Sequence, residues 1–382
     1  MKQSILGNLS PEQFLQQYWQ KKPLLIRQAF PDYHSPVSPD ELAGLALEEE
    51  MESRIILEHG KTPWELRNGP FSASDFSNLP DSHWTLLVQG VDHWVPEIRE
   101  LFEHFTFLPS WRLDDIMVSY ATDGGSVGPH YDQYDVFLLQ TEGRRRWQIG
   151  QNYDESAPRI QGTDLHILSE FDVVEEHILE PGDMLYLPPG IGHHGTAEGE
   201  CMTFSVGFRA PSHKEILMHF TDFLADQLPE HLRYSDPDQE EVKSTGEIDD
   251  RAIDRLQVIL QQYLGNRELI DQWFGEQMTQ PKYSQQSEDA CQNWDELLEG
   301  YSDCYLLVEA GARFAYRDAG QGFRLFADGE SYLCPSDETR MLGQRLCQSH
   351  GLTPDEWQAL SEEESRQLIL CLFNNGSLYL DN

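Results

Sequence analysis

Two short segments of the chain carry side chains that can hold a metal ion. In the sequence GPHYD, His130 and Asp132 stand two residues apart, and residues at that spacing in a β-strand point to the same face. His193 and His194 come much later, just after a Pro-Pro-Gly turn. Two histidines and one carboxylate form the facial triad that binds iron(II) and leaves coordination positions open for a cosubstrate and O2. The spacing therefore predicts an iron site on His130, Asp132 and either His193 or His194.

Three consecutive arginines, Arg144, Arg145 and Arg146, form a second group of interest. If this segment is a strand, Arg145 points to the face opposite Arg144 and Arg146. A guanidinium that faces a barrel interior needs an anionic partner, and it can bind a carboxylate through two hydrogen bonds. The segment thus predicts an anchor for the far carboxylate of a dicarboxylate cosubstrate. The alternative is that all three arginines face solvent on an edge strand.

The elements around these residues indicate a β-rich first part. Helical patterns with serine caps cover residues 11–20 and 38–48, and the clearest early strands are 23–27, 86–88 and 116–120. From 126 to 209 the chain consists of short strands separated by Pro and Gly turns, with strands predicted at 135–140, 145–149, 175–179, 184–187 and 201–208. Glu142-Gly143 is interpreted as the turn of a hairpin. This pattern is typical of an all-β barrel or sandwich.

The character of the sequence changes at Pro211. Helical apolar spacing predicts helices over 212–228 and 249–275, with a polar loop between them and a polar linker over 276–297. The last part mixes strands with helices, which we predict at 304–309, 313–316, 323–326, 336–349, 353–360 and 361–374. We therefore expect three domains, over 1–210, 211–297 and 298–382.

The charge balance restricts the kind of partner. The chain has 27 basic and 66 acidic side chains, a formal net charge of −39. Such a surface repels phosphate backbones and anionic lipids, which argues against naked nucleic acid and membranes as partners. It attracts a basic protein, for which ribosomal proteins and histones are abundant examples. The alternative is that the acidity serves only solubility.

Composition also indicates the compartment. The six cysteines are scattered without a CxxC pair, which is typical of reduced thiols in a cytosolic protein. The first residues, MKQSILGNLSPEQF, lack the apolar core of a signal peptide. No apolar run approaches the roughly 18 residues that a membrane span requires. We expect a soluble, cytoplasmic protein.

Five segments of residues 1–210 closely resemble the JmjC (cupin-like) ribosomal oxygenases. They include the opening segment, the metal strand, the arginine strand, the third-ligand segment and the end of the barrel: 14–27, 128–137, 143–147, 179–193 and 205–211. The whole chain is similar to the bacterial branch of this family, which hydroxylates an arginine of a ribosomal protein. The resemblance implies a double-stranded β-helix over 1–210, a helical dimerisation domain over 211–297 and a small α+β winged-helix-like domain over 298–382.

The resemblance also implies a reaction and roles for residues. The reaction would be C3-hydroxylation of an arginine in large-subunit ribosomal protein L-sixteen, with iron(II), 2-oxoglutarate and O2, by a homodimeric enzyme. In the family the distal histidine follows the Pro-Pro-Gly turn after two intervening residues, which selects His193 over His194 as the ligand beside His130 and Asp132. By position, Arg145 would bind the cosubstrate carboxylate, and Ser119 would be a polar partner of the cosubstrate.

Several alternatives remain at this point. Histidine hydroxylation or lysine demethylation on the same fold would need the same triad, and a non-catalytic cupin scaffold could bind a basic partner through its acidic surface. A winged helix usually suggests DNA, but the acidity favours a protein-contact or structural module. Carboxylates at the predicted mouth, on Asp123, Asp132 and Asp135, suit a cationic arginine guest. Asp135 could instead be a surface turn residue.

Overall fold

The computed structural model describes residues 4–58, 64–241, 244–283, 290–319, 322–349 and 351–381. It consists of two compact units, Met1–Ala210 and Pro211–Asn382. The boundary between them in the sequence is the point where the helical pattern begins. The further division at 297/298 stays a prediction. No helix in the described ranges combines the length and the apolar character needed to cross a membrane.

The first unit opens with two short helices that pack on the sheet that follows. Helices α1 (Pro11–Gln17) and α2 (Pro39–Leu45) each begin with a serine in a capping box and a proline at the first helical position, as the sequence predicts, and both end earlier than predicted. The fully buried ring of Phe14 on α1 lies 5.0 Å from that of Tyr186. This contact ties the N-terminal segment to the sheet.

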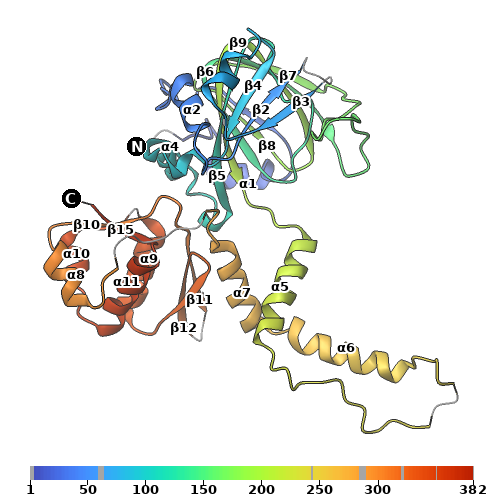
Figure 1. Cartoon of the computed structure of the whole chain (residues 1–382), viewed down its shortest axis with the longest axis vertical. Coiled ribbons are helices and arrows are strands. Elements are labelled where there is room, and N and C mark those ends of the chain that lie inside the picture. Colours follow the sequence, from blue (N-terminus) through green and yellow to red (C-terminus); the bar gives the residue numbers. More distant parts are fainter. Residues whose placement is uncertain are drawn as a thin grey trace. The chain divides into compact units, whose positions relative to one another are not determined.

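Nine strands form one sheet, which Figure 1 shows curved around an interior. The strand order is β1-β8-β6-β9-β5-β4-β2-β3, β7 pairs with β6, and the pairings are antiparallel. The strands are β1 (Leu24–Ile26), β2 (Ser53–Leu57), β3 (Glu65–Asn68), β4 (Trp84–Val88), β5 (Leu113–Ala121), β6 (Val136–Asn152), β7 (Glu175–Leu179), β8 (Met184–Leu187) and β9 (Ile191–Phe208). Short helical turns connect them: α3 (Ala73–Ser77), η1 (Val91–His93), α4 (Pro96–Arg99), η2 (Glu100–Phe105) and η3 (Ser110–Arg112). The predicted β-rich first part of the chain is confirmed.

The predicted hairpin with a turn at Glu142-Gly143 is wrong. Strand β6 continues through these residues for its full length and stays paired with β9. The register between the two strands shifts around Glu142, and Gly143 adopts a φ of 63°, so the segment is a bulge and not a reversal. A Cβ at Gly143 would overlap the carbonyl oxygen of Glu200 on β9. The bulge bends the long strand, whose first part pairs with β8 and whose later part pairs with β7.

Large aromatic side chains fill the main core of the first unit. Phe105, Phe137 and Phe208 are fully buried, and their ring centroids lie 5.0 to 5.9 Å apart. Aliphatic residues of β4, β5 and β9 continue this cluster. The same cluster includes Phe14 of α1 and Leu42 of α2, so the core joins the sheet to the N-terminal helices.

Three helices open the second unit: α5 (His213–Gln227), α6 (Asp250–Leu264) and α7 (Arg267–Thr279). The segment predicted as helical over 249–275 thus forms two helices. Helix α6 ends at Leu264 with Gly265 as its C-cap, and the side chain of Asn266 caps the start of α7. Helices α5 and α7 pack through Phe220 and Trp273, whose rings lie 5.2 Å apart. Figure 1 shows α6 extending from this pair.

The rest of the second unit is the small α+β module. Its two three-stranded sheets are β14-β10-β15 and β11-β12-β13, built from β10 (Tyr305–Val308), β11 (Phe314–Ala319), β12 (Gly322–Ala327), β13 (Glu330–Cys334), β14 (Gly351–Leu352) and β15 (Leu378–Asp381). The helices are α8 (Trp294–Tyr301), α9 (Asp337–Gln348), α10 (Pro354–Gln358) and α11 (Glu363–Asn374). Helix α7 packs on the second sheet, where Gly275 contacts Phe326 and Asp271 pairs with Arg317 at 3.0 Å. The helical segment and the module therefore share one packed unit.

Candidate metal centre and its cavity

His130, Asp132 and His193 converge in the first unit. Their ligand atoms all lie within 4.8 Å of one another. Among the described residues, these three side chains are the group that could hold a metal ion. His193 Nε2 lies 3.6 Å from Asp132 Oδ2, and the two imidazole centroids are 4.3 Å apart. Two nitrogens and one carboxylate oxygen on one side of a point are the donor set of a facial triad.

Backbone pairing holds the two segments of this cluster together. His130 and His193 exchange two backbone hydrogen bonds, although His130 lies outside the named strands, and Gly190 N donates to Asp132 O at 2.7 Å. Gly190 belongs to the Pro-Pro-Gly turn, and β9 begins directly after it. His193 therefore follows the turn, as predicted, and lies near the start of β9.

Both imidazoles are oriented for metal binding by their own backbone. His130 Nδ1 donates to Gly128 O at 2.9 Å, and His193 Nδ1 donates to Ile191 O at 3.0 Å. A carbonyl oxygen only accepts, so Nδ1 carries the proton and Nε2 keeps its lone pair for a metal. Burial, followed by the charge of His130, lowers the pKa of His193 to about 4. The imidazole is therefore neutral at neutral pH, as a ligand must be.

His194 has a different environment, although it adjoins His193. Alternation along β9 turns it to the other face, where its ring lies 6.3 Å from that of Phe171. Its Nε2 lies 3.5 Å from Thr196 Oγ1. The structure places His193 in the cluster and His194 outside it.

The three metal-binding side chains line a cavity of about 340 Å³. This volume suits a small organic acid together with one side chain of a guest. The wall comes from β2, β4, β5, β6 and β9, from the 127–134 segment that carries His130 and Asp132, and from the 165–167 segment that follows β6.

One arginine of the three enters this cavity. Arg145 is 3% exposed, and burial lowers the pKa of its guanidinium. Its Nη2 donates to Gly195 O at 3.3 Å, whereas Nε and Nη1 have no hydrogen-bond partner among the described residues. Arg144 and Arg146 face outward and pair with glutamates, both of them with Glu198. The alternative of three solvent-facing arginines is wrong.

A buried guanidinium with unused donors is costly unless an anion accepts from it. Arg145 therefore fits the far carboxylate of a dicarboxylate, in the same cavity as the metal-binding residues. Strand pairing explains its place: Arg145, Trp147 and Ile149 on β6 lie opposite Ala197, Gly195 and His193 on β9. The guanidinium and the metal ligand thus share one face of this pair of strands.

Ser119 also lines the cavity, and its hydroxyl donates to Thr203 O at 3.2 Å. Asp115 and Met117 of β5 line the same cavity, and both alternate with Ser119 along the strand. Asp115 is 3% exposed, and both of its carboxylate oxygens accept hydrogen bonds from Gln89 Nε2, at 3.0 and 2.8 Å. Asp115 was not among the predicted site residues, although the two-residue period that starts from Ser119 leads to it.

Neither interpretation of Asp135 is correct. It is fully buried and does not line the cavity, and its carboxylate accepts from Tyr186, Gln20 and Arg112 at 2.6, 2.9 and 3.1 Å. These donors come from three separate segments, so Asp135 cross-links the barrel to the N-terminal region. Asp123 does not line the cavity either, and its Oδ1 accepts from Gly199 N at 2.7 Å. Of the predicted mouth carboxylates, Asp132 alone lies in the cavity wall.

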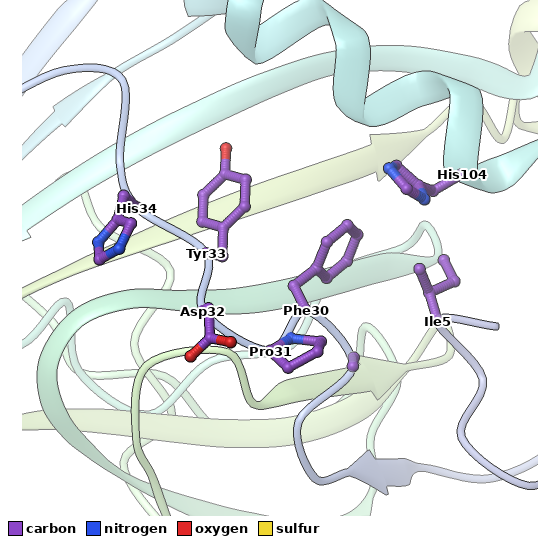
Figure 2. Close-up of a pocket in the computed structure, with 8 residues that line it drawn as sticks. Ile5, Phe30, Pro31, Asp32, Tyr33, His34 and His104 are labelled. Atoms are coloured by element: carbon purple, nitrogen blue, oxygen red, sulfur yellow. The ribbon is translucent and has the colours of Figure 1, made fainter. Parts of the chain in front are cut away.

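Figure 2 shows a second cavity of the first unit, of about 360 Å³. The rings of Phe30 and His104 meet edge to face there, with centroids 4.9 Å apart. The hydroxyl of Tyr33 and the carboxylate of Asp32 point in opposite directions. Because the Tyr33 hydroxyl and the Asp32 carboxylate diverge, the metal-binding cavity remains the candidate site.

Comparisons with known proteins agree with this geometry. Residues 100–216 match the family model of the JmjC domain, and residues 259–379 match that of the ROXA-like winged helix. The chain is 34% identical over 371 residues to the Ribosomal protein uL16 3-hydroxylase of Escherichia coli (strain K12), covering 96% of this chain and 97% of the relative. It is 37% identical over 276 residues to a Probable ribosomal oxygenase of Haemophilus influenzae, covering 70% and 67% of the two chains.

A solved structure extends the similarity to the whole fold. The ribosomal oxygenase YcfD from Escherichia coli, in complex with cobalt and 2-oxoglutarate, superposes with a TM-score of 0.84 at 34% identity, covering 98% of this chain and 99% of that one. The triad, the buried guanidinium and the near full-length similarity agree, and this chain belongs to the JmjC-domain ribosomal oxygenase family.

Proposed function

We propose that this chain is an iron(II)- and 2-oxoglutarate-dependent protein hydroxylase that acts on C3 of an arginine in ribosomal protein uL16. The observation that carries the proposal is the guanidinium of Arg145, which is buried with unused donors in the cavity that the triad lines. The Escherichia coli relative is named for uL16, and the YcfD structure is a complex with cobalt and 2-oxoglutarate.

The residues present fit the proposed cofactor and cosubstrate. His130 and His193 would hold iron(II) through Nε2 and Asp132 through its carboxylate, while Arg145 would take the far carboxylate of 2-oxoglutarate. Ser119 would lie beside the cosubstrate as a polar partner. When bound, iron(II) supplies O2 activation, with 2-oxoglutarate converted to succinate and CO2 as the target C–H bond gains oxygen. The chain itself orients the cosubstrate and the guest and excludes water.

The cavity offers a place for a cationic guest. The carboxylate of Asp115 lies in its wall, fixed by Gln89, and Asp114 and Tyr134 also line it. A carboxylate in a partly desolvated wall binds a guanidinium through charge-assisted hydrogen bonds, and the ring of Tyr134 can stack on its plane. We propose that Asp115 holds the guanidinium of the target arginine, so that the C3 carbon faces the metal-binding residues.

The second unit supports a proposal about assembly. Helix α6 buries none of its residues, and Ile253, Leu256 and Leu260 on one side of it are each about half exposed. An apolar helix face of this kind normally packs on a partner. We propose a homodimer through α5, α6 and α7.

The proposed substrate also bears on the partner class and the compartment. A ribosomal substrate implies a cytoplasmic location. We further propose that the winged-helix part contacts protein and not nucleic acid, because a net charge of −39 disfavours binding to phosphates.

The test is incubation of the full chain with iron(II), 2-oxoglutarate and a uL16 fragment. We expect succinate and a mass gain of one oxygen on an arginine, and neither with His130→Ala. Tandem mass spectrometry that places the oxygen on a histidine would replace arginine hydroxylation with histidine hydroxylation. Formaldehyde release from a methylated lysine peptide would indicate a demethylase. No succinate from the wild-type protein with any basic peptide would leave only the scaffold interpretation.

A further inference from the structure

We propose that Trp147 is a further cosubstrate-binding residue, whose indole N–H donates a hydrogen bond to bound 2-oxoglutarate, and that Gly195 provides the space that seats it. This inference rests on the proposed function, because it names a second donor of the same cosubstrate site. Trp147 lies on β6 two residues after Arg145, faces the same side and lines the same cavity.

The position of Trp147 is intermediate between the two groups that bracket a dicarboxylate. Its ring centroid is 5.9 Å from that of His193, and the guanidinium carbon of Arg145 lies 5.1 Å from its ring. In the strand pairing, Trp147 lies opposite Gly195. This pair stands between Arg145, which lies opposite Ala197, and His193, which lies opposite Ile149. A chain of five carbons that joins the metal to Arg145 therefore has to pass Trp147.

The indole nitrogen of Trp147 is a donor without an acceptor. Nε1 is buried and has no hydrogen-bond partner among the described residues, as is also true of Nε and Nη1 of Arg145. A buried tryptophan usually finds an acceptor for its N–H, and a buried donor without one is destabilising. Three unused donors on two neighbouring side chains of one cavity wall match a ligand that presents several acceptor oxygens. A dicarboxylate is such a ligand.

Gly195 explains how both side chains reach this place. A Cβ at position 195 would lie 2.6 Å from Arg145 Nε and 2.8 Å from Cη2 and Cζ3 of Trp147. The missing side chain lets the benzo edge of the indole lie over the backbone of β9, which leaves Nε1 on the other side of the ring. The carbonyl of Gly195 meanwhile accepts from Arg145 Nη2. Gly195 is thus a positioning residue for both donors.

The experiment measures cosubstrate binding without turnover. The full chain is loaded with zinc(II), which does not activate O2, and 2-oxoglutarate is titrated by calorimetry. Loss of one hydrogen bond to a charged acceptor predicts roughly tenfold weaker binding for Trp147→Phe, with zinc affinity unchanged. Gly195→Ala should weaken 2-oxoglutarate binding similarly, because it displaces both donors. Trp94→Phe is the matched control, since Trp94 is exposed and outside the cavity wall, and it should bind as the wild type does.

A second measurement uses the wild-type protein, so it stands even if a variant does not fold. Nitrogen-15 spectra resolve the indole N–H groups of the nine tryptophans, and manganese(II) broadens signals close to the metal. Trp147 is the tryptophan in the described wall of the metal-binding cavity, so the most strongly broadened signal is assigned to it. We expect that signal to move downfield when 2-oxoglutarate is added to the zinc form.

The possible results separate the inference from the proposed function. If the wild-type protein fails to bind 2-oxoglutarate, both are overturned. If the wild type binds it and Arg145→Gln does not, while Trp147→Phe binds normally and the indole signal stays in place, the role of Trp147 is overturned and the proposed function stands. Weaker binding by Trp147→Phe together with the downfield shift supports the inference.

Discussion

His130 N lies 3.0 Å from His193 O, and His193 N lies 2.8 Å from His130 O. In an antiparallel pair with both bonds, the two Cα atoms are about 5.5 Å apart. The imidazole rings therefore start from neighbouring points, and each ring is turned by its own Nδ1 hydrogen bond to a carbonyl two residues earlier. Backbone pairing and the two Nδ1 hydrogen bonds therefore position the two imidazoles beside each other.

The first prediction concerns the identity of the distal ligand. His193→Ala should weaken manganese(II) or iron(II) binding by at least about a hundredfold, because it removes one of three protein ligands. His194→Ala is the matched control on the adjacent position and should keep metal affinity within a few-fold. Electron paramagnetic resonance titration with manganese(II) measures both. Metal binding that survives His193→Ala and disappears with His194→Ala would assign the ligand to His194.

The second prediction concerns Arg145. Arg145→Gln should weaken 2-oxoglutarate binding by about a hundredfold, since it replaces a charge-assisted pair with a neutral contact. Thermal unfolding of the zinc form gives an independent measure. Adding 2-oxoglutarate should raise the melting temperature of the wild type and leave that of Arg145→Gln unchanged. Equal shifts in both proteins would show that the cosubstrate is held elsewhere.

The third prediction concerns the guest. Asp115→Asn keeps the size of the side chain and its hydrogen bond from Gln89 but removes the negative charge. We expect KM for a uL16 fragment to rise about tenfold or more, with 2-oxoglutarate affinity unchanged. Asp172→Asn changes the net charge by the same amount at an exposed position and should leave KM within a few-fold. A similar rise in both variants would indicate general electrostatic attraction in place of a specific contact.

The fourth prediction is a pH dependence of stability. Burial raises the pKa of Asp92 to about 7, against the opposing hydrogen bond from Ile116 N at 2.7 Å. The unfolded carboxyl has a pKa near 3.9, so between about pH 4 and pH 7 the folded state binds more protons than the unfolded state. The free energy of unfolding should therefore fall as pH rises through this window. Asp92→Asn keeps an acceptor for Ile116 N and should remove this contribution, which urea unfolding at pH 5 and pH 8 measures.

The Asp92 prediction has a clear contrary result. Wild type and Asp92→Asn that lose stability in parallel between pH 5 and pH 8 would show that other groups cause the dependence. His93 Nε2 lies 3.5 Å from Asp92 Oδ2, so the two groups can share a proton. His93→Gln tests whether the histidine contributes to the pH dependence of the free energy of unfolding.

The fifth prediction concerns assembly. Leu256→Glu combined with Leu260→Glu should convert the proposed dimer to a monomer, because both changes put a charge on the exposed apolar face of α6. Each isolated chain should lose little stability, since both positions are exposed. Gln261→Glu places one charge at an exposed position of the same helix and should leave the dimer intact. Sedimentation velocity measures the outcome, and a wild-type monomer at micromolar concentration would contradict the dimer.

Local patterns explain where sequence reasoning worked. The helix starts at Ser10 and Ser38 are recognisable because capping depends on residues within one turn. Strands β7 and β8 lie where the sequence predicts them, because turn residues on both sides limit each strand. The face that Ser119 shares with Asp115 was equally readable from a period of two, but the sequence analysis did not extend the pattern back along β5.

Non-local contacts explain where it failed. The Glu142-Gly143 pair resembles a hairpin turn. Strand β6 pairs with β9 on both sides of these residues, so they form a bulge. Asp135 resembles a turn or mouth residue, but donors from three distant segments bury it. In both cases partners far along the chain decide the outcome. Met202 lies opposite Glu142, and Tyr186 and Gln20 donate to Asp135 across 51 and 115 residues of sequence.

By itself, the sequence determined the chemical types and their spacing: two histidines, a carboxylate and an arginine. Only the tertiary structure decided that the ligand atoms of His130, Asp132 and His193 meet within 4.8 Å, and that Arg145 is the arginine with buried, unused donors. The physical reason is that alternation along a strand is local, whereas the direction of the barrel interior depends on which strands pair. Here the deciding pair is β6 with β9, and the residues that pair are far apart in the chain, for example Val136 with Gly207.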